Sequence, residues 1–370
     1  MRRIAGIYIH QNKKWPEFTW DSKALLPLLT KIRHKQGRLK GYMELLGFVT
    51  RNETTLQTLT MDVLKSTEIE GEFLNSDQVR SSIARRLGMD IAGMVPADRD
   101  VEGVVEMMLD ATQNYDKPLT KERLFGWHSA LFPGGRSGMH KIIVGKWRDN
   151  DKGPMQVISG AMGKEKVHYE APDAKHLNSE MTLFLKWFNA HTEMDAVLKS
   201  GIAHLWFVTI HPFDDGNGRI ARAIADMQLT KADNDAQRFY SMSAQIRIER
   251  KGYYDILEKT QKGNLDITEW LTWYFNCLDR ALNTTDQRLQ SVLKKTKFWD
   301  THIQTVINER QRLMINKLFD GFDGKLNSSK WAKITKCSAD TALRDIQDLI
   351  QKDILLKEDA GGRSTNYVLK

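Results

Sequence analysis

Hydrophobic residues recur every three to four positions over most of this 370-residue chain, a spacing that predicts a mainly helical protein. The pattern predicts helices from about 52 to 69, from 177 to 187 and from 267 to 282. Apolar residues with the same spacing precede and follow the stretch His211–Arg222, which reads HPFDDGNGRIAR. This stretch is therefore predicted to be a loop held between two buried helices.

A region near the middle of the chain, 134–172, is rich in glycine and lacks the helical spacing. Two runs within it, Met155–Ile158 and Lys166–Tyr169, are expected to pair as a β-hairpin joined by Ser159–Lys164. An ordinary surface hairpin would satisfy this pattern. A hairpin beside the loop would also offer an unpaired edge, to which an extended segment of another protein could add as a strand.

The last part of the chain predicts two helices followed by two strands. The helices, Ser328–Thr335 and Ser338–Lys352, each begin with a serine in a capping position. The strands, 354–357 and 365–369, are separated by a Gly-Gly turn. This order resembles a winged helix, with 338–350 as the recognition helix.

The net charge is +8, and the residues from 281 onward carry 16 Lys and Arg against 11 Asp and Glu, or +5. The exposed basic residues of the predicted winged helix would be Lys336, Arg344 and Arg363. This charge is compatible with DNA binding. A solvated basic face and a protein-docking role remain open alternatives.

Neither a membrane span nor a secretory signal is predicted. No stretch reaches about 18 uncharged apolar residues, and the start of the chain lacks a long apolar run. The two cysteines, Cys277 and Cys337, lie far apart and indicate neither a disulfide framework nor a zinc site. A cytoplasmic protein is expected.

The loop between the two buried helices has the composition of a phosphate site. Gly216, Asn217 and Gly218 stand where the second helix begins, so glycines allow a tight turn while the helix start supplies free N–H groups and a partial positive charge. Such a helix start binds anions. Arg219 and Arg222, three residues apart, share a helix face and can hold further phosphate oxygens.

Two more residues of the loop supply reactive groups. Asp215 is an oxygen ligand suited to Mg²⁺ beside the phosphates. His211 is the only group in the stretch that accepts a proton near neutral pH. Singly, each of these residues is more often structural. Together they indicate a site where a base activates a hydroxyl for attack on a nucleotide phosphate.

The joint string resembles the signature of the Fic family, HxFx(D/E)GNGRxxR, and matches every fixed position. The resemblance implies a Fic-fold helical bundle with a β-hairpin flap. It implies that His211 is the general base, that Asp215 holds Mg²⁺ and that Tyr254 lines the adenine pocket. The residues that would bind the phosphates of ATP are Gly216, Asn217, Gly218, Arg219, Ile220, Ala221 and Arg222.

A second motif lies at the end of the predicted helix 52–70. Ser66, Glu70 and Gly71 match the inhibitory motif of the same family, (S/T)xxxE(G/N). A helix that simply stops at a glycine is the alternative explanation. The resemblance implies that Glu70 pairs with Arg222 and turns the α-phosphate of ATP away from attack. Because the motif precedes the catalytic loop, the chain resembles the class of Fic proteins with an N-terminal inhibitory helix.

Three domains follow from these assignments. They are an N-terminal helical domain at 1–110, a Fic catalytic domain at 111–285, and a linker helix with a winged helix at 286–370. A polar linker is expected near Asn283–Gln287, followed by a helix of about 30 residues that leads to Phe319. A homodimer is compatible with this organisation.

The resemblance implies a protein adenylyltransferase that moves AMP from ATP to a Ser, Thr or Tyr hydroxyl of a target protein docked on the flap, about 154–170. Relatives that transfer a terminal phosphate carry a lysine where this chain has Gly218, which favours nucleotide transfer. Two alternatives stay open. One is a DNA-binding regulator whose Fic domain senses a nucleotide, and the other is a Fic enzyme that removes AMP.

Overall fold

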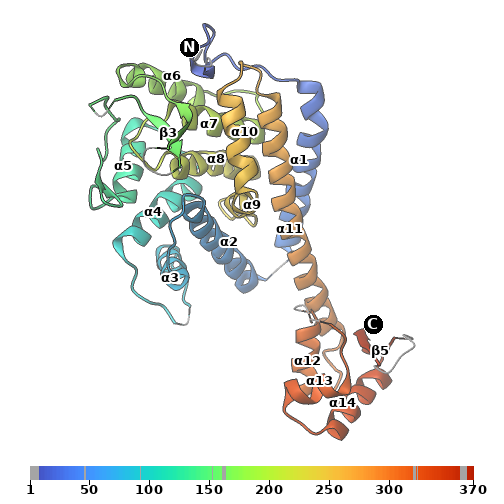
Figure 1. Ribbon diagram of the computed structural model, residues 1–370. Helices are drawn as coiled ribbons and strands as arrows, with labels where there is room; N and C mark the ends of the chain where they lie inside the picture. Colours follow the sequence, from blue (N-terminus) through green and yellow to red (C-terminus); the bar gives the residue numbers. More distant parts are fainter. Residues whose placement is uncertain are drawn as a thin grey trace. The chain divides into compact units, whose positions relative to one another are not determined.

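The structure is a computed structural model that describes residues 8–45, 47–91, 93–151, 153–160, 164–319, 322, 324–358 and 365–370. The chain forms two compact units, residues 1–285 and residues 286–370 (Figure 1). Among the described residues no helix is both long and apolar enough to cross a membrane.

The first unit is built almost entirely of helices, which confirms the predicted fold class. Helix α1 begins after Asp21, whose side chain caps the first turn as an N-cap carboxylate should. The helices of this unit are α1 (Ser22–Glu44), α2 (Phe48–Ile69), α3 (Ser76–Arg86), α4 (Arg99–Gln113), α5 (Lys121–Leu131), α6 (Leu177–Asn189), α7 (Ala196–Ile210), α8 (Asn217–Asp233), α9 (Met242–Ile248), α10 (Arg250–Gln261) and the first turns of α11 (Thr268–Thr301).

Helices α7 and α8 form the centre of this unit, as the apolar pattern on both sides of the loop predicts. All but the first and third residues of α7 are buried, because apolar side chains cover its whole circumference. Helix α8 packs on α7 and also contacts α2, α4 and α5 (Figure 1). The loop 211–216 that joins α7 to α8 is therefore held in place from several sides.

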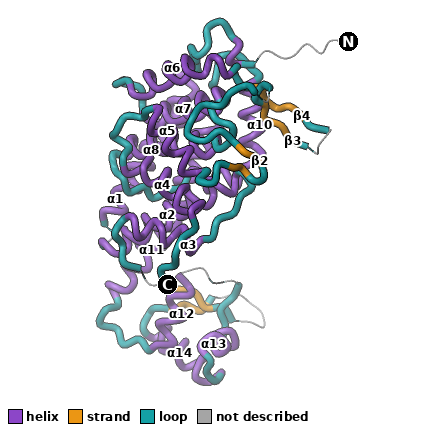
Figure 2. The backbone as a smooth tube through the Cα atoms, turned by 90° about the vertical axis from the view of Figure 1, so that its left-hand side faces the viewer, coloured by secondary structure: helices purple, strands orange, loops and turns teal. Residues whose placement is uncertain are grey.

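Short antiparallel strand pairs complete the first unit. The predicted hairpin is confirmed as β3 (Gln156–Ser159) paired with β4 (Lys166–Glu170), with a bulge between Val157 and Ile158. Figure 2 places this hairpin beside α10. A smaller pair, β1 (Arg136–Ser137) and β2 (His140–Lys141), follows α5.

The second unit contains α12 (Glu309–Phe319), α13 (Ser328–Thr335) and α14 (Ala339–Gln351), then β5 (Leu355–Lys357) paired antiparallel with β6 (Tyr367–Leu369). Its core forms around Trp331, Ile346 and Leu349, all fully buried. The predicted helices and strands are confirmed, and Ser338 caps α14 as predicted. The predicted Gly-Gly turn and Arg363 lie outside the described residues.

Two predictions about this part of the chain are wrong. The residues expected to form a linker, Asn283–Gln287, lie inside α11, which continues to Thr301. Polar side chains are tolerated there because Thr284 donates to the Arg280 carbonyl and Asn283 accepts from Lys35 of α1. The helix expected to run about 30 residues to Phe319 is therefore divided between α11 and α12.

The cap of α13 also differs from the prediction. Asn327, not Ser328, is the N-cap, and its side chain accepts from the Lys330 N–H at 2.8 Å. Both residue types serve well at this position, so the sequence alone does not separate them. The three predicted domains stay predictions, although the two compact units also divide between residues 285 and 286.

Candidate active site

The backbone turns sharply at His211, the first residue after α7. His211 adopts a left-handed conformation (φ 52°, ψ 59°), which is unusual for a residue with a side chain. Arg148 holds this turn from the outside: its Nε donates to the His211 carbonyl oxygen at 2.8 Å, and its backbone N–H donates to the Pro212 carbonyl at 3.0 Å. Arg148 is buried and also donates to Pro172. The turn therefore depends on a distant, buried arginine.

The His211 ring is oriented to work as a base. Its Nδ1 lies 3.1 Å from the Val208 carbonyl oxygen. Since a carbonyl only accepts, the proton of the neutral ring resides on Nδ1, and the Nε2 lone pair is left to accept a proton. Burial lowers the pKa of His211 to about 4, and the bond to Val208 offsets only part of that change. His211 is therefore neutral at physiological pH.

Two hydrogen bonds from the Asn217 side chain close the loop after His211. The Asn217 side chain accepts from the Phe213 N–H at 3.0 Å and donates to the Phe213 carbonyl at 2.8 Å. Gly216 has φ 78°, and a Cβ there would come within 2.9 Å of the Phe132 ring. Only glycine fits this position. The side chain of Asn217 is thus occupied in shaping the loop.

Helix α8 starts with backbone donors directed at the loop. The first hydrogen bond of the helix is donated by the Ile220 N–H to the Gly216 carbonyl. The N–H groups of residues 217–219 therefore have no acceptor within the helix. The partial positive charge of a helix start favours an anion here. Ile220 and Ala221, which were predicted to bind nucleotide, have fully buried side chains. Their contact with a nucleotide stays a prediction.

Asp215 is positioned by two neighbours from other elements. One carboxylate oxygen accepts from the Ser137 hydroxyl of β1, and the other accepts from the Gly216 N–H. His128 of α5 stacks on Phe213 with ring centroids 4.2 Å apart, and its Nε2 donates to the Asp215 carbonyl at 3.2 Å. Burial lowers the pKa of His128 to about 4, so this ring is a neutral structural part of the loop.

The Asp215 carboxylate fits the Mg²⁺ ligand that the sequence predicts. It is a hard oxygen donor, half-buried beside the start of α8. Among the described residues no cluster of three or more acidic, histidine or cysteine side chains could form a complete metal cage. The role of Asp215 as a Mg²⁺ ligand stays a prediction.

The two arginines of the loop each meet a carboxylate from the end of α2. Arg222, with 2% of its side chain exposed, pairs with Glu70 at 2.7 Å and donates to the Ser66 hydroxyl and carbonyl. Arg219 pairs with Glu72 at 2.7 Å and lies over the Phe132 ring. The buried Nε of Arg219 has no hydrogen-bond partner among the described residues, so this guanidinium retains a free donor.

Glu70 lies directly over the start of α8. A Cβ added to Gly218 would come within 2.3 Å of its Oε1. The hydroxyl of Tyr254 donates to Glu70 Oε2 at 3.3 Å, and Arg250 donates to the Ile69 carbonyl at 2.6 Å. Tyr254, predicted to line an adenine pocket, therefore lies beside Glu70. Its nucleotide contact stays a prediction.

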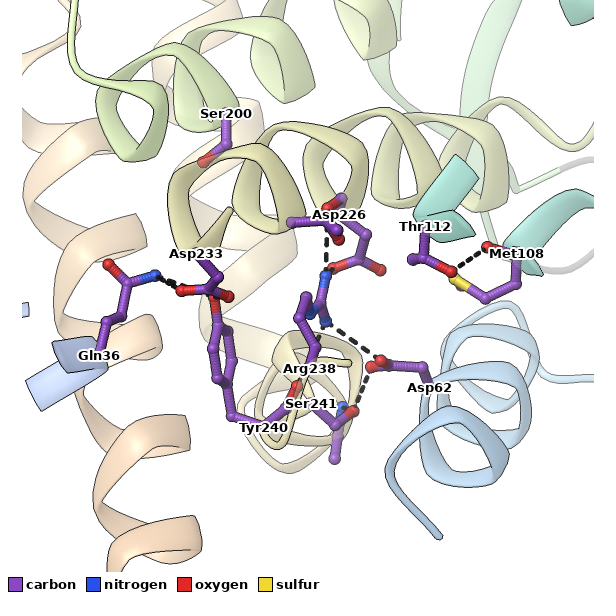
Figure 3. Close-up of polar contacts among 12 residues, drawn as sticks. Gln36, Asp62, Met108, Thr112, Ser200, Asp226, Asp233, Arg238, Tyr240 and Ser241 are labelled. Atoms are coloured by element: carbon purple, nitrogen blue, oxygen red, sulfur yellow. Dashed lines mark hydrogen bonds and ion pairs between the residues drawn. The ribbon is translucent and has the colours of Figure 1, made fainter. Parts of the chain in front are cut away.

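A buried ionic group connects α2 to α8 further along their contact. Figure 3 shows Arg238 between Asp226 of α8 and Asp62 of α2. Its guanidinium lies 2.5 Å from Asp226 and 3.1 Å from Asp62, and all three side chains are nearly inaccessible. Burial raises the pKa of Asp62 to about 7, and the like charge of Asp226 contributes to the rise.

Several positioning residues were missed by the sequence analysis. These residues are Arg148, His128, Ser137 and Glu72, none of which belongs to the two motifs. Each contacts a residue of the stretch from His211 to Arg222 that lies at least 63 positions away. Only Glu72 has a local signal in the sequence, because it is a second acidic residue two positions after Glu70.

The surface of the predicted recognition helix is less basic than a DNA-binding helix. Helix α14 carries one arginine, Arg344, and exposes Leu343. Lys336 lies in the left-handed turn before it. The acidic residues of this helix are Asp340, Asp345 and Asp348. Its own net charge is thus negative, which disfavours a role in contacting phosphates.

The stretch from His211 to Arg222 thus joins two buried helices and places two paired arginines in the first turns of the second helix. Residues 118–229 match the Fic/DOC family, and residues 8–89 match a domain of unknown function (DUF4172). Residues 118–229 therefore form a Fic/DOC domain, as the signature predicts.

Two curated proteins that are similar to this chain have names that give different transferred groups, AMP for one and UMP for the other. The chain is 32% identical over 224 residues to "Protein adenylyltransferase Fic" of Culex quinquefasciatus, covering 60% of this chain and 40% of that protein. It is 29% identical over 126 residues to "Uridine 5'-monophosphate transferase" of Xanthomonas campestris, covering 31% of this chain and 21% of that protein. The chain thus spans less than half the length of these relatives.

A solved structure has a similar fold over most of the chain. The crystal structure of a Fic family protein from Desulfovibrio desulfuricans aligns with a TM-score of 0.53 at 19% identity, covering 95% of this chain and 97% of that one. At this identity the likeness concerns the fold alone. It extends well beyond the residues of the Fic/DOC match.

Proposed function

We propose that this protein is an adenylyltransferase that transfers AMP from ATP to a hydroxyl of a target protein. The observation that carries the proposal is the His211 ring: its Nδ1 proton is held by Val208, so its Nε2 is available beside the anion-binding start of α8. The nucleotide is proposed from the names of the adenylyltransferase relatives. A uridine nucleotide is the alternative donor.

In the reaction, His211 Nε2 takes the proton from the target hydroxyl. The oxygen attacks the α-phosphorus in line, a new P–O bond forms, and the bond to pyrophosphate breaks. Backbone N–H groups of α8 and the guanidinium groups of Arg219 and Arg222 stabilise the charge on the phosphates. Mg²⁺ held by Asp215 would neutralise further charge when bound. The low pKa of His211 keeps the base unprotonated before each turnover.

The flap β3–β4 is proposed as the place where the target binds. It is a two-stranded sheet, so each of its strands has an edge that is unpaired within that sheet. A target segment that adds as a strand would be held mainly through its backbone, which asks little of its sequence. Ile158 is 55% exposed on this hairpin and offers an apolar contact.

Autoinhibition by Glu70 is part of the proposal. Arg222 cannot bind the γ-phosphate while its guanidinium is bound to Glu70 and Ser66. The Glu70 carboxylate also covers Gly218 at the helix start and repels a phosphate there. Bound ATP would then lack the contact that orients its α-phosphate toward His211.

A labelling experiment tests the whole proposal. The Glu70→Gly variant is incubated with Mg²⁺ and ATP labelled at the α-phosphate, and protein-bound label is measured. We expect more label than in the wild-type protein and none in the double variant with His211→Ala. UTP labelled at the same position distinguishes the two donors. Label that persists without His211 would refute the proposed base.

For the second unit we propose protein docking in preference to DNA binding, because α14 carries three aspartates against one arginine. Fluorescence anisotropy of a labelled random duplex checks this. Binding that survives physiological salt would contradict protein docking. Binding that disappears there would agree with a weak, non-specific basic surface.

A further inference from the structure

The segment that ends helix α2 carries two carboxylates that face the same site. Glu70 is the C-cap residue directly after α2, and Glu72 follows after one glycine. Glu70 contacts Arg222, and Glu72 contacts Arg219, each at 2.7 Å. Arg219 and Arg222 are three residues apart on one face of α8. Both arginines of the proposed phosphate site are therefore bound by one short acidic segment.

Backbone geometry explains why both carboxylates point the same way. The Gly71 N–H donates to the Glu68 carbonyl at 3.1 Å, and the Glu72 N–H donates to the Thr67 carbonyl at 3.3 Å. This pair of bonds, with Gly71 at φ 89°, is a Schellman motif. It folds the chain back over the end of α2, so Glu72 returns toward α8 next to Glu70.

The charges of the four groups cancel. Two guanidinium groups and two carboxylates leave no net positive charge from these residues for a triphosphate to meet. A nucleotide whose phosphates contact both arginines must replace both ion pairs, and it must also approach two negative charges. Arg219 is 3% exposed, so its pair with Glu72 is only partly screened by water, although Glu72 itself is 48% exposed.

We propose that Glu72 is a second inhibitory carboxylate, which weakens nucleotide binding by occupying Arg219 while Glu70 occupies Arg222. This inference rests on the proposed nucleotide site and extends its regulation to a residue outside the (S/T)xxxE(G/N) motif. Because Glu72 is the more exposed of the two, it is the carboxylate that a basic group of a partner reaches first.

A binding measurement separates Glu72 from its neighbours. The ligand is α,β-methylene-ATP with Mg²⁺, because its carbon bridge prevents transfer, and the method is isothermal titration calorimetry. The variants are Glu72→Gln, Glu70→Gly and the control Glu68→Gln. Glu68 has the same charge and lies in the same turn, but it pairs with Lys65 and Arg247, away from the phosphate site.

We expect Glu72→Gln to bind the nucleotide roughly threefold to tenfold more tightly than the wild-type protein, with Glu68→Gln unchanged. Combined with Glu70→Gly, it should tighten binding further. Equal affinity of Glu72→Gln, Glu72→Ala and wild type, with Glu70→Gly tighter, would overturn the inference and leave the proposed function intact. Equal tightening by Glu68→Gln would overturn it too, since net charge alone would then be the cause.

Absence of binding by every variant, including Glu70→Gly, would instead overturn the proposed function and the inference with it. Thermal melting of each variant accompanies the titrations. Glu72→Ala is titrated as well, because a glutamine can keep a neutral hydrogen bond to Arg219. If Glu72→Ala also binds like the wild-type protein, the inference is refuted.

Discussion

Arg148 Nε lies 2.8 Å from the carbonyl oxygen of His211 and keeps that residue in its left-handed turn. The guanidinium also donates to the Pro172 carbonyl at 2.6 Å, so one buried side chain connects the segment after β4 to the loop 211–216. His211 is thus positioned through its backbone, whereas the Val208 carbonyl sets the orientation of its ring.

We predict that Arg148→Lys lowers kcat by roughly tenfold to a hundredfold and the free energy of unfolding by about 2 to 3 kcal/mol. A lysine ammonium is a single point charge and cannot reproduce the planar guanidinium, which donates to the His211 and Pro172 carbonyls at once. Transfer assays in the Glu70→Gly background and urea denaturation measure the two effects. The exposed Lys146→Ala is the control and should change neither.

The pH dependence of transfer should follow the low pKa of His211. Because burial lowers that pKa to about 4, the base is neutral above this value and is lost only as the pH falls through it. We expect kcat/KM of the Glu70→Gly variant to stay level between pH 8 and pH 6 and to decline toward pH 4. A midpoint near 6.5, the value of an ordinary histidine, would show that the ring is not desolvated in solution.

Gly71 should be required for inhibition because its conformation directs both carboxylates. Gly71→Ala forces a side chain into φ 89° and is expected to cost about 1 kcal/mol of stability. It should also raise transfer activity several-fold, since the strained cap holds Glu70 and Glu72 less well. Gly71→Asn is the matched comparison, because asparagine tolerates the left-handed region. Similar behaviour of both variants would contradict a role for the cap.

Asp62 should contribute to a pH-dependent stability. Its pKa is raised to about 7 in the folded protein, so the folded state holds a proton that the unfolded chain releases near pH 4. The stabilisation from this proton is present at low pH and is lost as the pH rises from about 4 to about 7.

The Asp62→Asn variant isolates this effect, because it cannot titrate. We expect the free energy of unfolding of wild type minus that of Asp62→Asn to fall by about 1.4 kcal/mol per pH unit at most across this range. Urea denaturation at several pH values measures it. A difference that is constant with pH would show that Asp62 stays ionised beside Arg238 throughout.

Local pattern was sufficient to predict much of this protein. Helical spacing located the core helices, and the alternation between 155 and 169 located the flap, because these signals depend on neighbours in the chain. The contiguous string from His211 to Arg222 likewise contains its own chemistry. Errors arose where distant contacts override local preference, as at Asn283, which Lys35 of α1 holds inside a helix.

What the sequence by itself determined is the composition of the site: a histidine, an acid, two glycines and two arginines in one loop. Only the tertiary structure decided their state. Arg148 and His128 orient the loop from other elements, and the ring of His211 acquires its low pKa from burial. The pairing of Glu72 with Arg219 joins residues 147 positions apart. Such contacts depend on how helices pack, which local sequence does not encode.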